Sequence, residues 1–246
     1  AATGKEKIKK PFNPMLPGFK HVKYGDANAV EKAIDSKTAA VIVEPIQGEA
    51  GIIVPPKDYL KRLRKICSKN NILLILDEVQ TGCGRTGKFF AYEHSKIKPD
   101  IVVLAKGLAN GIPIGATIAT KEVAASFETG DHGSTFGGNP VSCTAANFTI
   151  DYIIKNKLIN NAEKQGKYMV KKINSLNLNN IKDLRGKGLM IGVEIKGNAK
   201  DIVKKCSNKG LLINSTSNKV LRFLPPLIIN KKTIDDAINI LESVLK

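Results

Sequence analysis

The chain has 246 residues, of which 42% are apolar, and its formal net charge is +17 because 39 Lys and Arg residues outnumber 22 Asp and Glu residues. This length and apolar content exclude a disordered tail and suffice for one large domain or two smaller ones. The charge alone would favour a polyanionic partner such as nucleic acid or an acidic membrane. No apolar run approaches the roughly 18 residues that a membrane-spanning helix needs, so we expect no membrane association.

The positive residues are scattered along the chain. In KDYLKRLRKICSK, residues 57–69, Leu60, Leu63, Ile66 and Cys67 fall on one face of a helix and the bases cover the rest. This pattern favours a solvated helix surface over a surface that binds nucleic acid. Trp is absent and only 5% of residues are aromatic, which leaves few platforms for stacking bases. We therefore expect no nucleic-acid partner.

Cysteine and histidine usage argues against a metal site. The four cysteines lie far apart and show no CxxC spacing, and His21, His94 and His132 are equally isolated. Neither a zinc site nor a compact disulfide framework is indicated. A reducing compartment, the cytoplasm, is the simplest location for unpaired cysteines.

Short aliphatic runs alternate with helical patterns in the first half of the chain. Strands with continuous apolar character, separated by segments of crossover length, indicate a mainly parallel sheet covered on both faces. The predicted fold class is therefore α/β. Four runs are predicted to be fully buried strands: AAVIVE (39–44), ILLILDE (72–78), IVVLAK (101–106) and IGATIAT (114–120).

The pattern changes after a long predicted helix at about residues 141–156, because Asn and Lys become frequent up to residue 182. A last helix is predicted to begin after Asn230, a typical N-cap residue. We predict a large domain over residues 1–156 and a small C-terminal α+β domain over residues 157–246. The small domain is predicted to contain three shorter strands: LMIGVEI (189–195), LLI (211–213) and VLRF (220–223).

Ionisable residues follow three of the predicted strands. Glu44 ends the first strand, Asp77 and Glu78 end the second, and Lys106 ends the third. Ligands of open parallel sheets bind at the carboxyl ends of the strands, so two acids and a lysine at one edge suggest a site. A structural ion pair between Asp77 and Lys106 is the alternative, since buried pairs occur without catalysis.

The residue types at this edge suit one cofactor. A partly desolvated lysine at a strand end is the residue type that forms Schiff bases, because burial favours its neutral, nucleophilic amine. An acid on a neighbouring strand can hold a cationic ring nitrogen. Together they meet the requirements of pyridoxal phosphate chemistry, which needs a lysine for the aldehyde and a carboxylate that keeps the pyridine ring protonated.

LILDEVQTGCGRTGKFFAYEH, followed by Lys106 in LAKGLANGIPIGA, resembles the class III (ornithine-type) aminotransferases of fold type I. Three further motifs, VEPIQGEAG (43–51), HGSTFGGNP (132–140) and LRFLPPL (221–227), occur in the order of that family. The resemblance covers essentially the whole chain and implies the fold of PLP-dependent transferases of type I. Within the family, HGSTFGGNP and RFLPPL are most similar to the acetylornithine and ornithine aminotransferases.

The resemblance implies roles around pyridoxal 5'-phosphate (PLP). Lys106 would form the Schiff base with the cofactor and then transfer the proton between substrate and cofactor. Asp77 would pair with the pyridinium nitrogen, Val79 would pack against the ring, and Gln80 would hydrogen-bond its phenolic oxygen. Thr135 would offer its hydroxyl to the cofactor phosphate across a dimer interface. From the residues alone, Val79 also fits an ordinary core position and the Thr135 loop also fits a plain turn.

The resemblance also implies a substrate site. Arg222 resembles the family arginine that clamps a substrate carboxylate, a task suited to a planar bidentate donor. Glu49 resembles its partner, which neutralises the arginine for an ω-amino substrate and swings aside for 2-oxoglutarate. Glu44 would line the same cavity. Arg85 in GCGRTGK is interpreted as a structural arginine that satisfies loop carbonyls.

The implied reaction is a ping-pong transfer of an amino group from N-acetylornithine to 2-oxoglutarate, as in arginine biosynthesis, by a homodimer. Ornithine δ-aminotransferase, 4-aminobutyrate transaminase and an aminomutase are alternatives within the family. A basic binding protein on the same scaffold is the non-enzyme alternative. Lys106, Asp77, Gln80 and Arg222 together argue against it, because a scaffold needs none of them.

Members of this family extend further at the N-terminus, where they carry a phosphate-binding loop at the start of a helix. No comparable Gly/Ser/Thr loop precedes a helix in residues 1–40. We therefore expect this sequence to be N-terminally truncated, to bind the cofactor poorly by itself and to leave core surface exposed.

Overall fold

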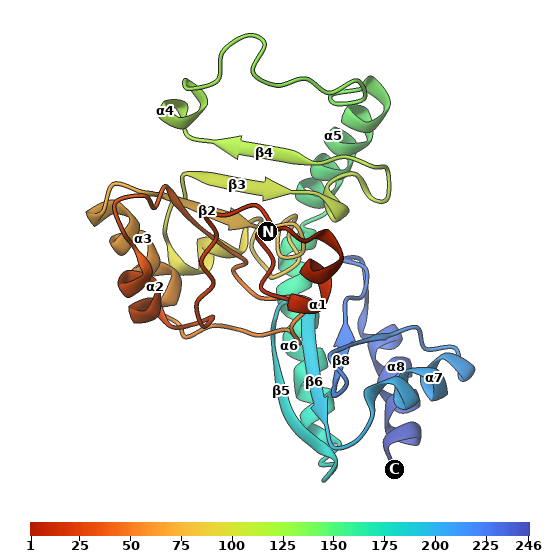
Figure 1. Ribbon diagram of the computed structural model, residues 1–246. Coiled ribbons are helices and arrows are strands. Elements are labelled where there is room, and N and C mark those ends of the chain that lie inside the picture. Colours follow the sequence, from red (N-terminus) through yellow and green to blue (C-terminus); the bar gives the residue numbers. More distant parts are fainter.

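The computed structural model describes residues 1–246 and contains two four-stranded sheets with helices packed against them (Figure 1). The first sheet has the strand order β1-β2-β3-β4, in which β1, β2 and β3 pair in parallel and β4 is antiparallel to β3. This confirms the mainly parallel sheet that the sequence predicts. Its strands are β1 (Ala40–Val43), β2 (Leu73–Asp77), β3 (Ile101–Leu104) and β4 (Ala116–Ala119).

Helix α3 (Tyr59–Lys69) covers this sheet as its sequence pattern predicts. All four apolar residues of the predicted face are buried and form one cluster with Leu74 and Leu76 of β2. The helix is also fixed to the sheet by a shared acceptor: Asp100 Oδ2 accepts hydrogen bonds from Arg64 and from the Leu74 backbone N–H, both at 2.6 Å. The lysines of the opposite face are exposed.

The prediction that the four strands are fully buried is wrong, most clearly for β1 and β4. Along β2, Leu74 and Leu76 are buried but Ile75 between them is only partly covered. On the outer strands, Ile42 is 52% exposed and Ile118 is 48% exposed. Both belong to edge strands, which have a neighbour on one side only. The buried clusters gather on the face of the sheet that carries Leu74 and Leu76, so the other face is less well covered.

The second sheet is antiparallel throughout, with the order β5-β6-β8-β7, and it confirms a C-terminal α+β unit (Figure 1). Its apolar face and three helices bury the largest core cluster of the protein. The strands are β5 (Ile181–Lys187), β6 (Met190–Ile195), β7 (Asn214–Thr216) and β8 (Val220–Phe223), and the helices are α6 (Leu158–Ser175), α7 (Ala199–Asn208) and α8 (Lys231–Leu245).

One strand prediction in this unit is wrong. The LLI segment at 211–213 is not a strand, because the Leu211 N–H donates to Cys206 O at the end of α7 and Leu212 points to solvent, 85% exposed. The strand begins only at Asn214. VLRF does form β8, and Asn230 does cap α8, since its side chain accepts a 2.9 Å hydrogen bond from the Thr233 N–H.

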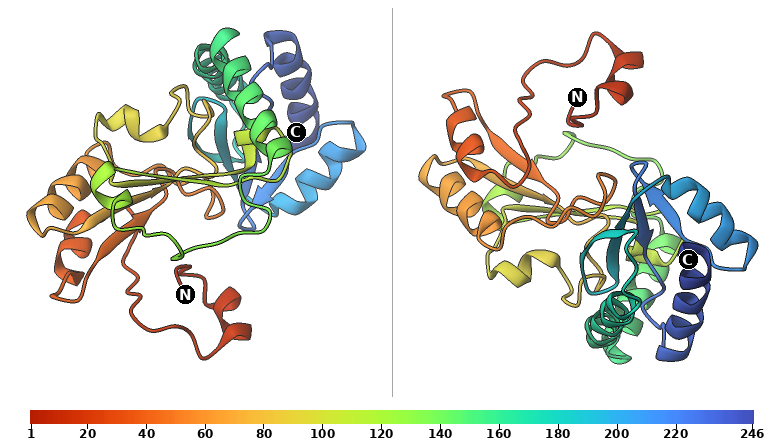
Figure 2. Two further views of the ribbon diagram at one scale, coloured as in Figure 1. Left: turned by 90° about the horizontal axis from the view of Figure 1, so that it is seen from above. Right: turned by 90° about the horizontal axis from the view of Figure 1, so that it is seen from below.

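Helix α5 (Pro140–Lys155) and helix α6 connect the two sheets. Leu158, at the start of α6, packs with Ile153 in a cluster of the first sheet. The predicted division at residues 156 and 157 therefore stays a prediction. In both views of Figure 2 the N-terminal segment, in red, runs outside the two sheets. The remaining helical turns are short: α1 (Glu6–Lys9), η1 (Lys10–Phe12), α2 (Ala27–Ala33), η2 (Ala91–Ser95), η3 (Lys106–Ala109) and α4 (Lys121–Ala124).

None of the helices combines the length and the apolar character needed to cross a membrane. All four cysteines are unpaired.

The C-terminal core predicts a clear contrast between two helical isoleucines. Ile238 of α8 is 1% exposed, whereas Ile154 of α5 is 56% exposed. Ile238→Ala is expected to lower the free energy of unfolding by about 2–5 kcal/mol because it leaves a cavity in a packed core. The matched change Ile154→Ala should cost less than about 1 kcal/mol. Urea denaturation followed by circular dichroism measures both, and equal losses would contradict this assignment of the core.

Candidate active site

Parallel pairing brings the three predicted strand-end residues to one edge of the sheet. Val43 of β1 pairs with Leu76 of β2, and Asp77 pairs with Val103 of β3, so these strands end side by side. Glu44 lies close enough to Asp77 and Lys106 for both charges to act on it. Burial raises the pKa of Glu44 above its ordinary value, and Asp77 raises it further, while a hydrogen bond from the Gly48 N–H and the charge of Lys106 oppose the shift.

The two adjacent acids have different surroundings. Successive side chains of a strand point to opposite faces, and Glu78, just after β2, is 1% exposed. Its carboxylate accepts hydrogen bonds from the Thr81 hydroxyl at 2.5 Å and from the backbone N–H groups of Ala91 and Tyr92 at 3.0 and 2.9 Å. Glu78 therefore holds the glycine-rich segment that follows β2 in place.

Asp77, in contrast, stays partly exposed. Its Oδ1 accepts a 3.0 Å hydrogen bond from the Val79 N–H, and its Oδ2 has no partner within the chain. The side-chain hydrogen bond fixes the carboxylate and leaves one oxygen available for a ligand. Of the two acids that end the second predicted strand, only Asp77 is free to act in the site.

Lys106 occupies an unusual backbone position with a free side chain. Its φ angle is +48°, a left-handed conformation that residues other than glycine seldom adopt and that is concentrated at functional sites. Its amine makes no ion pair or hydrogen bond within the chain. The alternative of a structural Asp77–Lys106 ion pair is therefore wrong: the two groups lie at the same edge without bonding to each other.

A cavity of about 510 Å³ opens beside Lys106, whereas Asp77 and Glu44 do not line it. Val79, Gln80 and Lys106 contribute to its wall, and so do the aromatic side chains Phe148 and Tyr152 of α5. The segment after β8 also lines it, through Leu224, Pro226, Leu227 and Ile228. The lining is mainly apolar with a few polar groups, which is the usual character of a small-molecule site.

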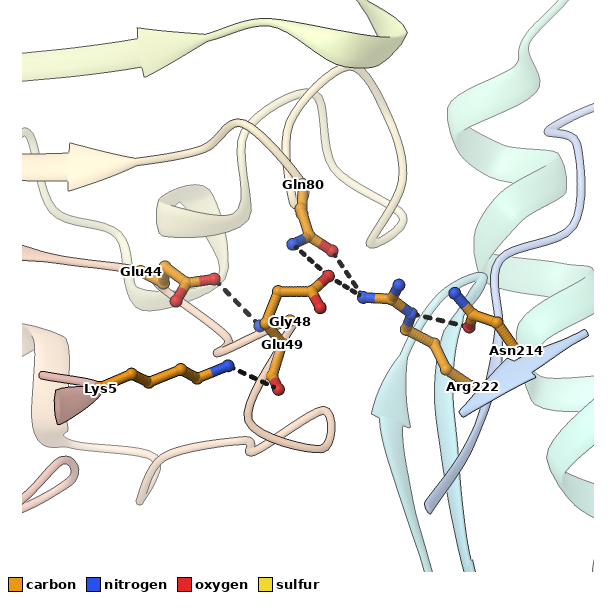
Figure 3. A network of polar contacts seen from close by, with 7 residues as sticks. All are labelled: Lys5, Glu44, Gly48, Glu49, Gln80, Asn214 and Arg222. Carbon is orange, nitrogen blue, oxygen red and sulfur yellow. Dashed lines mark hydrogen bonds and ion pairs between the residues drawn. The ribbon is translucent and has the colours of Figure 1, made fainter. Parts of the chain in front are cut away.

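Arg222 and Glu49 meet beside Gln80, a residue of the cavity wall (Figure 3). Arg222 of β8 is 9% exposed, and one guanidinium nitrogen contacts Glu49 Oε1 at 2.5 Å. Gln80 bonds to both partners at 3.3 Å, and Asn214 accepts from Arg222 Nε at 3.0 Å. The hydrogen bond from Arg222 is the main reason why the pKa of Glu49 lies below its ordinary value.

Arg85 is a structural residue, as the sequence suggested. Its guanidinium donates to the carbonyl oxygens of Pro225 and Leu189, at 2.5 and 3.3 Å, and the Leu189 N–H returns a hydrogen bond to Arg85 O. Burial lowers the pKa of Arg85 to about 10. These bonds tie the glycine-rich segment after β2 to the second sheet, although Arg85 also lines the cavity.

Thr135 does not join this group. Its side chain is exposed on the segment between α4 and α5, and it does not line the cavity. Its predicted role at a cofactor phosphate stays a prediction, as do the roles of the other matching residues. No group of three or more His, Cys, Asp or Glu side chains is placed to hold a metal ion.

Asn214 is a site residue that the sequence did not reveal. It faces Arg222 because Asn214 and Arg222 are paired in the register of β7 and β8. The predicted strand at 211–213 begins three residues before β7, so the prediction does not include the pairing partner of Arg222. Only the strand register identifies this contact.

The chain belongs to the aminotransferase class-III family, which matches residues 1–245. It is 49% identical over 245 residues to the acetylornithine aminotransferase of Aquifex aeolicus and 51% identical over 246 residues to that of Methanocaldococcus jannaschii. The ornithine aminotransferase structure from Toxoplasma gondii ME49 matches it with a TM-score of 0.96 at 37% identity and covers 99% of this chain. The resemblance predicted from the motifs is thereby confirmed, together with fold type I.

These matches cover 100% and 99% of this chain but only 64% and 62% of the two relatives, and 60% of the solved structure. The chain therefore spans less than two thirds of the length of each.

The different surroundings of the adjacent acids predict different effects on folding. Glu78→Ala removes the acceptor of three donors, two buried and one partly buried, and is expected to destabilise the fold by about 3 kcal/mol. Asp77→Ala removes one partly exposed hydrogen bond and should cost about 1 kcal/mol. Denaturant unfolding of both variants tests the contrast. An Asp77 variant as unstable as the Glu78 variant would show that both acids are structural.

The Arg222–Glu49 pair predicts a pH dependence. The pKa of Glu49 is lowered from 4.5, so the folded state favours the charged carboxylate and gains stability above that pH. Because Glu49 is 58% exposed, the gain relative to Glu49→Gln should be under about 1 kcal/mol. The difference in unfolding free energy between native and variant protein should be constant from pH 7 to about 4.5, then shrink as the pH falls through the lowered pKa. A difference that grows in acid would refute the pairing.

Proposed function

We propose that this protein is a PLP-dependent aminotransferase that moves an amino group from N-acetylornithine to 2-oxoglutarate by a ping-pong mechanism. One observation carries the proposal: an unbonded amine on Lys106 and an unbonded oxygen of Asp77 lie at one sheet edge, and Lys106 lines a cavity together with Gln80, which hydrogen-bonds to both members of the Arg222–Glu49 pair. Membership of the class III family supports it.

The residues present fit the cofactor. PLP requires an amine for its aldehyde and a carboxylate for its ring nitrogen, and the free groups of Lys106 and Asp77 supply both. Val79 and Gln80 line the cavity, where an apolar side chain suits a ring face and an amide suits a phenolic oxygen. A solved structure of the Toxoplasma gondii ornithine aminotransferase has partial occupancy of PLP at its active site.

When bound, the cofactor withdraws electrons from the substrate Cα and so makes its proton acidic. Asp77 maintains this withdrawal by holding the ring nitrogen protonated, and the Val79 N–H keeps its carboxylate oriented at 3.0 Å. Lys106 Nζ binds the cofactor between turnovers, accepts the Cα proton during the reaction and returns a proton on the other side of the transferred nitrogen. Its side chain has no competing partner.

Arg222 and Glu49 allow one site to accept two substrates, of which only one brings a second carboxylate to this position. With Glu49 in place, the positive charge of Arg222 is neutralised, which suits a donor that brings no second carboxylate to this position. The second carboxylate of 2-oxoglutarate can replace the Glu49 carboxylate on Arg222. Arg222 is held by Asn214 while the Glu49 side chain is mostly exposed, so the glutamate is the partner that moves.

The donor and the assembly are inferred from the relatives. Two relatives are named acetylornithine aminotransferases and the solved structure an ornithine aminotransferase, so ornithine is the second candidate donor. We place Thr135 at the cofactor phosphate of a second subunit. An interface in such a homodimer would cover two apolar residues of α5, Val141 and Phe148, which are 71% and 68% exposed. A cytoplasmic location fits the unpaired cysteines.

Borohydride reduction of the full-length protein loaded with PLP, followed by peptide mapping, tests the proposal. A phosphopyridoxyl group is expected on Lys106, and Lys106→Ala should lower amino transfer at least about a thousandfold because it removes both the attachment and the proton carrier. Lys98→Ala changes an exposed lysine that lies before the start of β3 and should retain activity. A label on another lysine, or none, refutes the mechanism.

The same preparation compares donors. Amino transfer from N-acetylornithine, ornithine, 4-aminobutyrate and lysine to 2-oxoglutarate should be fastest with the first. A basic binding protein without chemistry would transfer none of them and would instead bind DNA with a steep salt dependence.

A further inference from the structure

Glu49 lies on a loop that crosses from the first sheet to the second. The loop, residues 44–53, follows β1, and Ile52 is 0% exposed in a small cluster with Ile46 and Met190 of β6. It packs directly on Gly192, where an added Cβ would come within 2.9 Å of the Ile52 Cβ. The loop that carries Glu49 is therefore docked on the second sheet.

The docked segment is strained. Ile52 has a φ angle of +53°, which a β-branched residue rarely adopts, and the preceding Gly51 has a φ angle of +113°. Such a conformation is unfavourable by itself and persists only where the surroundings fix it. The contacts that hold Gly51 and Ile52 thus also decide where Glu49 lies.

Two backbone hydrogen bonds, of 3.1 and 3.0 Å, join Gln47 to Ile53 across the loop, and Arg185 of β5 adds a side-chain contact to the segment between them. Its Nε donates to Gly51 O at 3.0 Å. One of its terminal nitrogens is bonded to Asp183 at 2.5 Å and to Glu194 at 2.8 Å. Since two carboxylates fix the guanidinium from the other side, it is a rigid donor toward the loop.

The loop is also held before and at Glu49 (Figure 3). Glu44 accepts a 2.9 Å hydrogen bond from the Gly48 N–H, and Lys5 donates to Glu49 O at 3.2 Å. With Gly51 held by Arg185, the backbone on both sides of Glu49 is fixed. The Glu49 side chain, 58% exposed, remains free to turn.

We propose that Arg185 is a positioning residue for the carboxylate switch. By holding Gly51 O it keeps the backbone of Glu49 where the carboxylate reaches Arg222, and it thereby sets the balance between the paired state and a free Arg222. The inference rests on the proposed function, because it takes Arg222 to be the group that receives substrate carboxylates.

The direction of the effect follows from competition. A dicarboxylate must displace Glu49 from Arg222, so any change that loosens the Glu49 loop weakens the pair and favours the dicarboxylate. The amino donor, which needs Arg222 neutralised, should bind less well after the same change. A general loss of structure would instead weaken the binding of both the dicarboxylate and the amino donor.

The test uses full-length protein with Arg185→Met and the matched control Lys182→Met. Lys182 lies on the same strand and also contacts Glu194, at 3.4 Å, but makes no hydrogen bond to Gly51. Calorimetric titration measures the Kd of glutarate, and steady-state kinetics gives the KM of the donor. Arg185→Met should bind glutarate about fivefold to tenfold more tightly and raise the donor KM, since it removes one charge-assisted hydrogen bond. Lys182→Met should change both constants less than about twofold.

A double-mutant cycle with Glu49→Gln decides whether Arg185 acts through Glu49. In the Glu49→Gln background, Arg185→Met should leave the glutarate Kd unchanged. A persistent effect there, or weaker binding of both ligands in the single variant, overturns the proposal. If Arg185→Met does not fold, Arg185→Lys, which keeps the charge but not the rigid fork, serves in the same cycle. If the cycle shows that Arg185 acts through Glu49 but the unmodified full-length protein transfers no amino group, the proposed reaction is refuted and the positioning role of Arg185 is retained.

Discussion

Parallel pairing of β1, β2 and β3 is the constraint on which the site depends. Because the three strands run in the same direction, the residues that follow them meet at one edge, and the charges of Asp77 and Lys106 both act on Glu44 there. Because successive side chains of a strand point to opposite faces, the neighbouring acids Asp77 and Glu78 lie in different surroundings. Asp77 faces the site, while Glu78 is buried and holds the segment after β2.

The second constraint is the close approach of the two sheets, which glycines make possible. A side chain on Gly188 would overlap the backbone of Arg85 and Thr86, and one on Gly192 would overlap Ile52. Since neither position carries a side chain, the second sheet can pack directly against loops of the first. Arg222 reaches Glu49 only because of this packing.

The two members of the Arg222–Glu49 pair differ in exposure, which makes the carboxylate easier to replace than the guanidinium. The guanidinium is 9% exposed and held by neighbouring side chains, whereas the carboxylate is 58% exposed. A partly exposed pair contributes at most about 1 kcal/mol, so another carboxylate can compete with it. A fully buried pair would be too costly to open. The cation is therefore fixed while its anionic partner can be replaced.

Local pattern in the sequence determined the strands of the first sheet, the buried face of α3, the cap of α8 and the acids and lysine at the strand ends, because each depends on residues close in the chain. Only the tertiary structure decided the exposure of Ile42 on its edge strand, the start of a strand at Asn214 and the hold of Arg185 on Gly51. These depend on which strands become neighbours and how two sheets pack, and periodicity within one segment carries no information about either.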